Sequence, residues 1–415
     1  MAAERIFRRA RVDEAGPLVD LAVEGDRFLA LGPNLPLRAP EEVDLGGRCV
    51  LPGLVESHIH LDKAFLEERE PNLSGTLGDA IRITAKLKAG FTRHDIRERA
   101  ERVLRMALRH GTLFLRTHVE VDPIIKLQGM EAILELREAY RGLLDIQIVV
   151  FPQEGIEQQP GTYELMREAL RMGGDAVGGV PYNDLDARRH VDLVFSLAQE
   201  FGAAADLHVD FSDNPADRTI EYIAQKTVAL GYQGRVSAGH LTALGSIPGE
   251  EAKRLIGRIA AADIHIIPLP ATDLHLGGRG DRVAVRRGLT RIRELLKAGA
   301  NVAFASNNIR NAFTPTGNAD LMEVGLLLAC AAHMSTPEER RTVLRMCTGN
   351  AARLMGLGAD YGLQEGRRAD FVAFDSSDYG SLLLDQPEKR YVVKGGRVVV
   401  ENRLENLWRA PLPGG

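Results

Sequence analysis

The feature that most constrains the fold of this chain is a repeated alternation between short apolar runs and helical patterns. From His58 to Asn308 this alternation occurs about eight times. The runs at 112–121, 145–151 and 204–209 are examples, and a helical pattern over 77–109 precedes the first of them. Such runs are apolar throughout, which is typical of parallel strands buried on both faces. Eight units of this kind predict a closed (β/α)8 TIM barrel, an α/β fold whose active site lies at the carboxyl ends of its strands.

Both ends of the chain have a different pattern, with short predicted strands and no helical period. Runs at 5–12, 18–23, 27–31 and 47–51 are separated by Gly-Pro and Gly-Asp turns, and similar runs return at 371–374, 390–394 and 397–400. We predict that the two ends form one small discontinuous β-sandwich domain. The predicted domains are residues 1–52 and 365–415 for the β-sandwich and residues 53–364 for the barrel.

Composition bounds the class of protein and its partners. The 415 residues are 45% hydrophobic and 26% charged, as in a globular protein with a sizeable core. A net charge of −5 without a basic tract argues against nucleic acid as a partner. We find no long apolar span and no signal-peptide pattern, and the three cysteines are widely separated. We therefore expect a cytoplasmic protein that acts on a small molecule and has no membrane partner.

Histidines follow several of the predicted strands. His58 and His60 end the first apolar run one residue apart, and side chains at i and i+2 of a strand share a face. Both rings could therefore reach one ion, and neutral imidazole is a common ligand of zinc and also suits iron. On its own this pair is weak evidence, because two histidines at this spacing are more often incidental. His208 and His240 also fall at predicted strand ends, so the four together favour a metal or catalytic site.

Several motifs resemble those of one superfamily over nearly the whole chain. They are Leu51-Pro52-Gly53-Leu54, His58-Ile59-His60-Leu61-Asp62-Lys63, Arg116-Thr117-His118-Val119, Phe151-Pro152-Gln153-Glu154-Gly155, Gly239-His240, Leu274-His275-Leu276-Gly277-Gly278-Arg279 and Thr348-Gly349-Asn350-Ala351-Ala352-Arg353. By these motifs the chain resembles the amidohydrolase superfamily, and within it the cytosine deaminase and isopropylammelide aminohydrolase group. The Phe-Pro-Gln-Glu-Gly motif is the most specific to this group.

The resemblance implies a role for each matched residue. His58, His60 and His208 match the ligands of one divalent ion, zinc or iron, and His240 matches a catalytic histidine that polarises the substrate or holds the attacking water. Gln153 matches a glutamine that reads the amide edge of the ring. The implied reaction is hydrolysis of a C–N bond in a small cyclic amidine or amide, such as a pyrimidine or triazine, by metal-bound hydroxide. Members of this group are often oligomers, so we expect a homo-oligomer.

Two positions depart from the pattern of the group. Phe211 stands where the deaminases have a proton-shuttling acid, and Asn307 stands where they have an aspartate that binds the metal and takes a proton. A carboxamide accepts hydrogen bonds but no proton near neutral pH. We therefore expect a substrate other than cytosine.

Other residues of the sequence could replace the missing proton carriers. Asp210 is the preferred candidate, because it would share a strand face with His208. Further candidates, each more simply explained as a capping or ion-paired residue, are Asp62, Lys63, Glu120, Asp122, Glu154 and Asp273. We also count Asn307 as catalytic, and Phe211, Asn308 and His275 as substrate contacts. Phe211 would be an apolar wall of the pocket or a simple core residue.

Two functional hypotheses follow from these observations. The first is a metal-dependent hydrolase with altered proton-transfer residues. The second is a catalytically altered or inactive relative that keeps the barrel as a scaffold for ligand binding or assembly. We favour the enzyme, because a site without chemistry has little physical reason to keep four histidines and a glutamine at its strand ends.

Overall fold

The computed structural model describes residues 3–407. The described part of the chain folds into two compact units, one made of residues 3–53 and 362–407 and the other of residues 54–361. Within the described residues, no helix is both long enough and apolar enough to cross a membrane.

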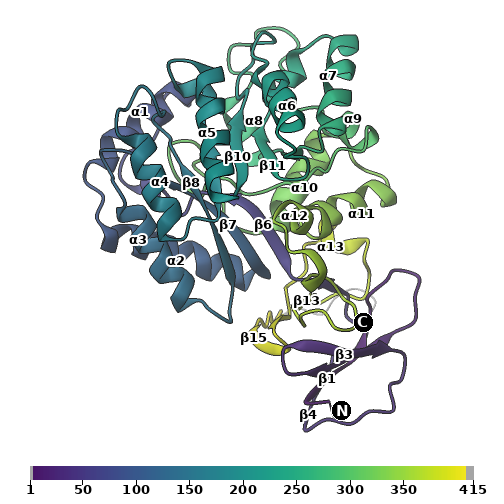
Figure 1. Cartoon of the computed structure of the whole chain (residues 1–415). Coiled ribbons are helices and arrows are strands. Elements are labelled where there is room, and N and C mark those ends of the chain that lie inside the picture. The colour runs from purple at the N-terminus through teal and green to yellow at the C-terminus, as the bar shows by residue number, and fades with distance from the viewer. Residues whose placement is uncertain (1–2, 408–415) are drawn as a thin grey trace. The chain divides into compact units, whose positions relative to one another are not determined.

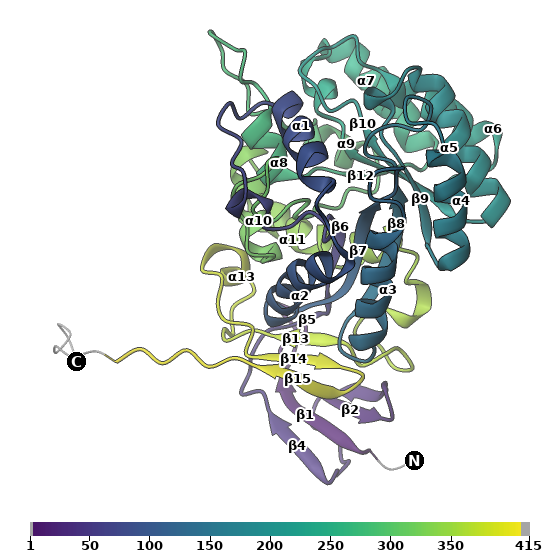
Figure 2. The same ribbon diagram turned by 90° about the vertical axis from the view of Figure 1, so that its left-hand side faces the viewer.

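The first unit consists of two four-stranded sheets built from both ends of the chain (Figure 2). One sheet has the order β3-β2-β1-β4, with β1 (Arg5–Ala10), β2 (Val19–Glu24), β3 (Arg27–Gly32) and β4 (Glu41–Asp44). The other has the order β15-β14-β13-β5, with β5 (Val50–Pro52), β13 (Phe371–Ala373), β14 (Tyr391–Lys394) and β15 (Arg397–Glu401). The short helix α13 (Ser381–Leu384) lies in the loop after β13. The predicted discontinuous β domain is thus confirmed.

The two sheets of this unit share one apolar core. Phe7 and Phe28 from the first sheet meet Phe371 of the second, with ring centroids 4.9 and 6.1 Å from that of Phe371. The pairing of β5 with β13 is antiparallel and joins residues more than three hundred positions apart in sequence. Burial of this core is what holds the two chain ends together.

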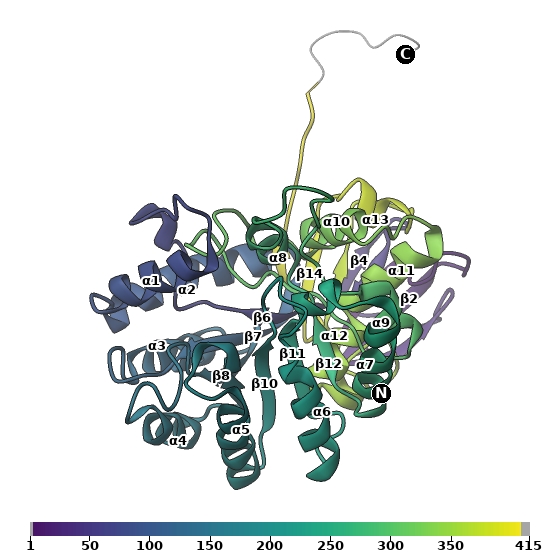
Figure 3. The same cartoon turned by 90° about the horizontal axis from the view of Figure 1, so that it is seen from above.

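The second unit has a seven-stranded sheet in which every neighbouring pair is parallel. In sheet order these strands are β6 (Leu54–Ile59), β7 (Thr112–Glu120), β8 (Asp145–Phe151), β9 (Ala176–Gly179), β10 (Ala204–Val209), β11 (Val236–His240) and β12 (His265–Ile267). Viewed from above, the strands lie at the centre and helices surround them (Figure 3). The fold is a nearly closed, TIM-like barrel, as predicted.

The eighth strand predicted at 301–305 is not a regular strand, and here the prediction was wrong. Residues 301–307 close the barrel through one bridge at each end, from Val302 to Ile266 and from Asn307 to Ile59. Two causes interrupt a continuous ladder. The Ser306 N–H donates to the Glu56 carboxylate rather than to a strand, and Asn307 has a left-handed φ of 61°. Asn307 still exchanges two backbone hydrogen bonds with the end of β6, which fixes it beside the histidines.

Helices follow most of the strands (Figure 1). They are α1 (Leu77–Lys88), α2 (Arg93–Arg109), α3 (Gln128–Ala139), α4 (Thr162–Met172), α5 (Ala187–Phe201), α6 (Thr219–Ala229), α7 (Gly249–Ala261), α8 (Pro270–Leu276), α9 (Ile292–Lys297), α10 (Leu321–Ala331), α11 (Pro337–Met346) and α12 (Gly349–Leu354). Single 3-10 turns lie at Leu66–Glu68, Pro181–Asn183, Thr242–Ser246 and Gly358–Asp360. The helical pattern at 77–109 is two helices, because Thr92 caps the start of α2 by accepting the Asp95 N–H.

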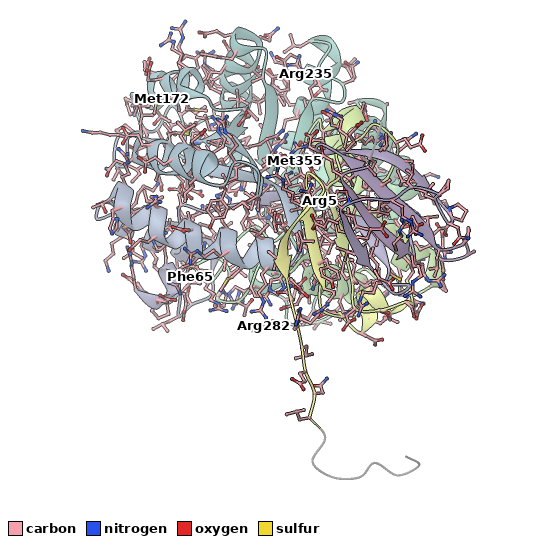
Figure 4. All side chains as sticks on the ribbon, turned by 90° about the horizontal axis from the view of Figure 1, so that it is seen from below. Arg5, Phe65, Met172, Arg235, Arg282 and Met355 are labelled. Carbon is pink, nitrogen blue, oxygen red and sulfur yellow. The ribbon has the colours of Figure 1, made fainter. Side chains whose placement is uncertain are left out.

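Burial follows this layering. All nine residues of β7 are buried, as expected for a strand covered on both sides. Figure 4 shows, by contrast, the half-buried Met172 at the end of α4 and the exposed Arg235 just before β11, both toward the periphery of this unit. The carboxyl ends of β6, β7, β10 and β11 meet in the interior, and the candidate site lies there.

Candidate active site

Three histidine rings converge at the carboxyl ends of β6 and β10. The Nε2 atom of His208 lies 3.2 Å from Nε2 of His58 and 3.1 Å from Nε2 of His60. Two nitrogen ligands that share one zinc ion at about 2.0–2.1 Å lie roughly 3.3 Å apart in tetrahedral geometry. All three rings are buried. Their spacing therefore fits ligands of a single ion.

A fourth buried ring, His118 at the end of β7, belongs to the same cluster. His58, His118 and His208 offer ring nitrogens that all lie within 4.8 Å of one another, so these three can also hold a divalent ion. The His118 Nε2 lies 3.2 Å from Oδ1 of Asp206, and the other oxygen of that carboxylate accepts a hydrogen bond from Arg116. We predicted no role for His118 from the sequence, although the Arg-Thr-His motif at a strand end was the signal that could have found it.

The cluster is built for neutral imidazole. Burial, together with neighbouring histidines and Lys63, lowers the pKa of His58 and His60 well below the usual range, and burial with the neighbouring histidines does the same for the pKa of His208. Neutral imidazole is the form that binds a metal. Nε2 atoms that face one another at these distances cannot all carry a proton, so some present lone pairs to each other. A cation between them would accept the lone pairs of all three nitrogens.

His240, the last residue of β11, lies beside this cluster and is held from two sides. Its Nδ1 lies 2.6 Å from Oδ1 of Asp273, a buried residue of α8 whose Oδ2 accepts the Leu269 N–H. The phenyl ring of Phe211 is stacked on the imidazole. Burial raises the pKa of Asp273, and the hydrogen bond to His240 opposes that rise. Since Nδ1 is engaged, the other ring nitrogen of His240 is left for the cavity that the ring lines.

A small cavity of about 10 Å³ lies against the histidines. Its lining consists of His60, Lys63, Gln153, Tyr182, His208, Phe211, His240, Thr272, Asn307, Asn308 and Phe313. Its mixture of aromatic side chains and a few polar groups is typical of a small-molecule site. No carboxylate is among the lining residues.

Most of the residues predicted from sequence meet at this cavity. Gln153, Phe211, Asn307 and Asn308 line it together with His60, His208 and His240. Asn307 donates a hydrogen bond through Nδ2 to the Thr272 hydroxyl, and its Oδ1 is buried with no partner among the described residues. That orphaned oxygen is available to an ion, a water or a substrate.

Asp210 and His275 are not brought to the cavity. Strand β10 ends at Val209, and Asp210 has a φ of 46°, so the alternation of strand faces does not extend to it. Its carboxylate accepts the backbone N–H groups of Thr219 and Ile220 at the start of α6. This residue therefore caps a helix instead of facing inward beside His208. His275 is half-buried on α8 and is not among the lining residues.

Behind the cavity lies a buried network of charged groups. The Lys63 Nζ donates to Oε1 of Glu120 at 2.9 Å and to Oε1 of Gln153 at 2.8 Å. Lys88 of α1 lies 2.6 Å from the other oxygen of Glu120, and it contacts Asp122 and Glu154 at 2.8 Å each. Burial would lower the pKa of Lys88, but the three carboxylates hold it above its usual range. The three carboxylates could themselves hold a metal, but the Lys88 ammonium already takes that place.

The match to known proteins agrees with this geometry. Residues 41–400 match the model of the amidohydrolase family. The chain therefore belongs to this family, and it is a hydrolase acting on C–N bonds other than peptide bonds.

Particular relatives cover almost the whole chain. The chain is 30% identical to N-isopropylammelide isopropyl amidohydrolase of Pseudomonas sp. strain ADP over 96% of its own length and 98% of the relative's. The structure of 5-methylcytosine deaminase from Klebsiella pneumoniae, liganded with 5-fluorocytosine, matches with a TM-score of 0.93 at 32% identity, over 97% of this chain and 99% of that one. N-isopropylammelide isopropylaminohydrolase from Burkholderia multivorans matches with a TM-score of 0.85 at 32% identity, over 97% and 99%.

Proposed function

We propose that this protein is a metal-dependent hydrolase that removes an amino or alkylamino group from a small planar heterocycle, a pyrimidine or a triazine. The observation that carries the proposal is the convergence of the neutral imidazoles of His58, His60 and His208, of which His60 and His208 line a small cavity. The ligand of the 5-methylcytosine deaminase structure and the names of the triazine relatives are consistent with this substrate class.

His58, His60 and His208 would hold one divalent ion, zinc or iron. We choose His60 over His118 as the third ligand, because His60 lines the cavity whereas the His118 Nε2 is engaged by Asp206. Bound there, the ion would lower the pKa of a water molecule toward neutrality and so supply hydroxide at the edge of the cavity. The ring of His118 then packs against the ring of His58, with the two centroids 3.9 Å apart.

The remaining residues bind and orient the substrate. Asp273 fixes His240 so that its free ring nitrogen can hydrogen-bond to the reacting carbon's substituent or to water. Phe211 and Phe313 give the cavity apolar walls on which a planar ring can stack. Neither Phe211 nor Asn307 can take up a proton near neutral pH, which is why we propose a substrate other than cytosine.

The test is a metal analysis joined to a substrate screen. Protein purified without added metal, and then reconstituted with zinc or iron, should retain close to one ion and release ammonia or an amine from some pyrimidine or triazine. His60→Ala should lose both properties, whereas His118→Ala, the matched control, should keep the ion. Less than about a tenth of an equivalent of metal after reconstitution, with no turnover, would contradict the proposal.

A second candidate is a scaffold that binds a ring without turning it over. The uncharged side chains of Phe211 and Asn307 at the cavity favour it. Turnover of any heterocycle that is abolished by His60→Ala would exclude the scaffold.

A further inference from the structure

Helix α10 has an unusual composition for a helix at the outside of the barrel unit, where it packs next to α8 and α11 (Figure 2). Glu323 is its only charged residue, and the other ten residues are apolar or glycine. A helix that is apolar on all sides is normally buried, whereas a surface helix carries polar side chains on its outward face. Helix α10 is nevertheless open on one side, because Leu327 is 39% exposed and Cys330 is exposed as well. Its sequence is therefore that of a helix whose open side is covered.

The open side of α10 carries a continuous apolar stripe. Leu327 and Cys330 lie three positions apart, about one turn of the helix. Val324 precedes Leu327 by three positions and Ala331 follows it by four, and both are half-buried. We call these four residues the α10 face. The next helix, α11, has the usual pattern, with charged residues such as Arg345 on its exposed side. An exposed apolar patch bounded by polar groups is typical of a surface that binds another protein.

Opposite charges without an ionic partner lie at the two ends of the α10 face. At its amino-terminal end, the Glu323 carboxylate accepts a hydrogen bond from Asn318 and has no cation beside it among the described residues. At its carboxyl-terminal end, the Arg287 guanidinium lies 2.9 Å from Nε2 of His333, and no described carboxylate pairs with it. Since a guanidinium can only donate, the His333 nitrogen that faces it accepts and is unprotonated. His333 therefore does not neutralise the charge of Arg287.

The surface around Arg287 is a hollow of about 440 Å³ beside the end of α10. Its lining includes residues 285–294 together with Ala331, Ala332 and His333. The hollow contains three further arginines, and each of these is paired with a carboxylate. The pairs are Arg286 with Asp281 and Asp213, Arg291 with Glu294, and Arg293 with Glu339. A single carboxylate that entered the hollow would therefore meet one guanidinium that has no ionic partner.

We propose that the α10 face binds the same face of a second copy of this chain, with the two α10 helices antiparallel. A twofold axis makes such an interface self-complementary, because each patch then meets its own counterpart. Ten positions, about 15 Å of helix, separate Glu323 from His333, which contacts Arg287. The antiparallel arrangement would bring each copy's Glu323 to the other copy's Arg287, and it would place Leu327 close to the axis.

A second copy is favoured over a different protein, because the α10 face supplies both halves of its own charge pairing. The carboxylate at one end and the guanidinium at the other are the pattern that a twofold axis joins, and the apolar stripe between them would be covered by itself. This assembly needs neither the metal nor the substrate of the proposed hydrolase.

Sedimentation velocity of the purified full-length protein tests the assembly. The wild type should sediment at micromolar concentration as a dimer of twice 45.4 kDa, or as a larger assembly of such dimers. Leu327→Arg, which puts a charge at the centre of the stripe, should weaken the dimer at least about 100-fold. Leu143→Arg is the matched control, since Leu143, after α3, is 37% exposed, and it should leave the mass unchanged. A monomeric wild type, or an assembly whose mass Leu327→Arg leaves unchanged, would overturn the proposal.

Charge reversal tests the pairing of Glu323 with Arg287 directly. Glu323→Arg and Arg287→Glu should each weaken the dimer about 10-fold or more, because like charges then meet at both ends. An equimolar mixture of the two variants should form heterodimers, since every facing pair is again of opposite sign. Native mass spectrometry distinguishes the heterodimer from either homodimer by mass, and circular dichroism checks that both variants are folded. Single variants that dimerise as tightly as the wild type, or folded variants that do not associate when mixed, would contradict the pairing.

Discussion

The phenyl ring of Phe211 lies almost parallel to the imidazole of His240, with ring centroids 3.8 Å apart and an interplanar angle of 12°. The Asp273 carboxylate binds Nδ1 of the same imidazole. His240 is thus clamped on one face and at one nitrogen, so its remaining nitrogen has a fixed direction. We expect this stacking to position His240.

Replacing Phe211 with leucine should weaken this clamp while keeping an apolar wall. We expect a loss of about 0.5–1.5 kcal/mol in the free energy of unfolding, since the stacking is lost but most of the buried area remains. A fall in kcat larger than the change in KM should accompany it. Urea unfolding and steady-state kinetics on the substrate found in the screen measure both. A kcat equal to that of the wild type would show that the stacking does not position His240.

Asp273→Asn should separate the orientation of His240 from metal binding. The carboxamide keeps the shape of the side chain but loses the charge that fixes the protonated Nδ1 of His240. We expect kcat to fall about 10²- to 10⁴-fold while the metal content stays unchanged. Asp281→Asn, on the loop after α8, is the matched control and should have little effect. Loss of the metal from Asp273→Asn would instead indicate a structural role for this residue.

Lys88→Met should leave three buried carboxylates without their shared cation. Removing one partner of a buried ion network typically costs about 3–5 kcal/mol, because the remaining charges are uncompensated. We expect a loss of that size in the free energy of unfolding, measured by urea denaturation. Lys86→Met, on the same helix but exposed, should change it by less than about 0.5 kcal/mol. Equal stability of the two variants would contradict the network.

Acidification should weaken the barrel through Asp184. Burial opposes ionisation of this carboxyl, but hydrogen bonds from His190 and from backbone N–H groups, including that of Ile156, hold its pKa below the usual range. The unfolded chain therefore binds a proton more readily than the folded one. The stability that Asp184 contributes is fully present above the unfolded pKa of about 4 and is lost as the pH falls toward the folded value.

Urea midpoints of the wild type and Asp184→Asn, compared between about pH 3 and pH 6, measure this contribution. The wild type should lose more stability on acidification than the variant. Parallel pH profiles would show that Asp184 contributes nothing to the acid sensitivity.

Much of the site could be predicted because its residues end apolar runs. His58, His208 and His240 each close a strand that the hydrophobic pattern marks clearly, and parallel strands bring such ends together. The last strand was harder, because the Glu56 side chain and the φ of Asn307 interrupt its ladder, and neither is visible in a local pattern. The prediction that Asp210 faces the cavity failed for a similar reason, since β10 ends one residue before it.

The charged network could not be predicted from sequence, because it depends on tertiary packing. Lys88 reaches Glu120 only after α1 has folded back over the end of β7, and no spacing rule links these residues to Gln153. The sequence offered Lys63 and Glu120 only as separate candidate proton carriers. The homo-oligomer stays a prediction, and light scattering of the purified protein tests it.

The most direct test of the central claim is a crystal structure with anomalous scattering recorded at the zinc and iron edges. We predict one strong peak between the Nε2 atoms of His58, His60 and His208, beside the cavity that Gln153 and Asn307 line. Crystals soaked in either metal that show no peak at these three nitrogens would contradict it.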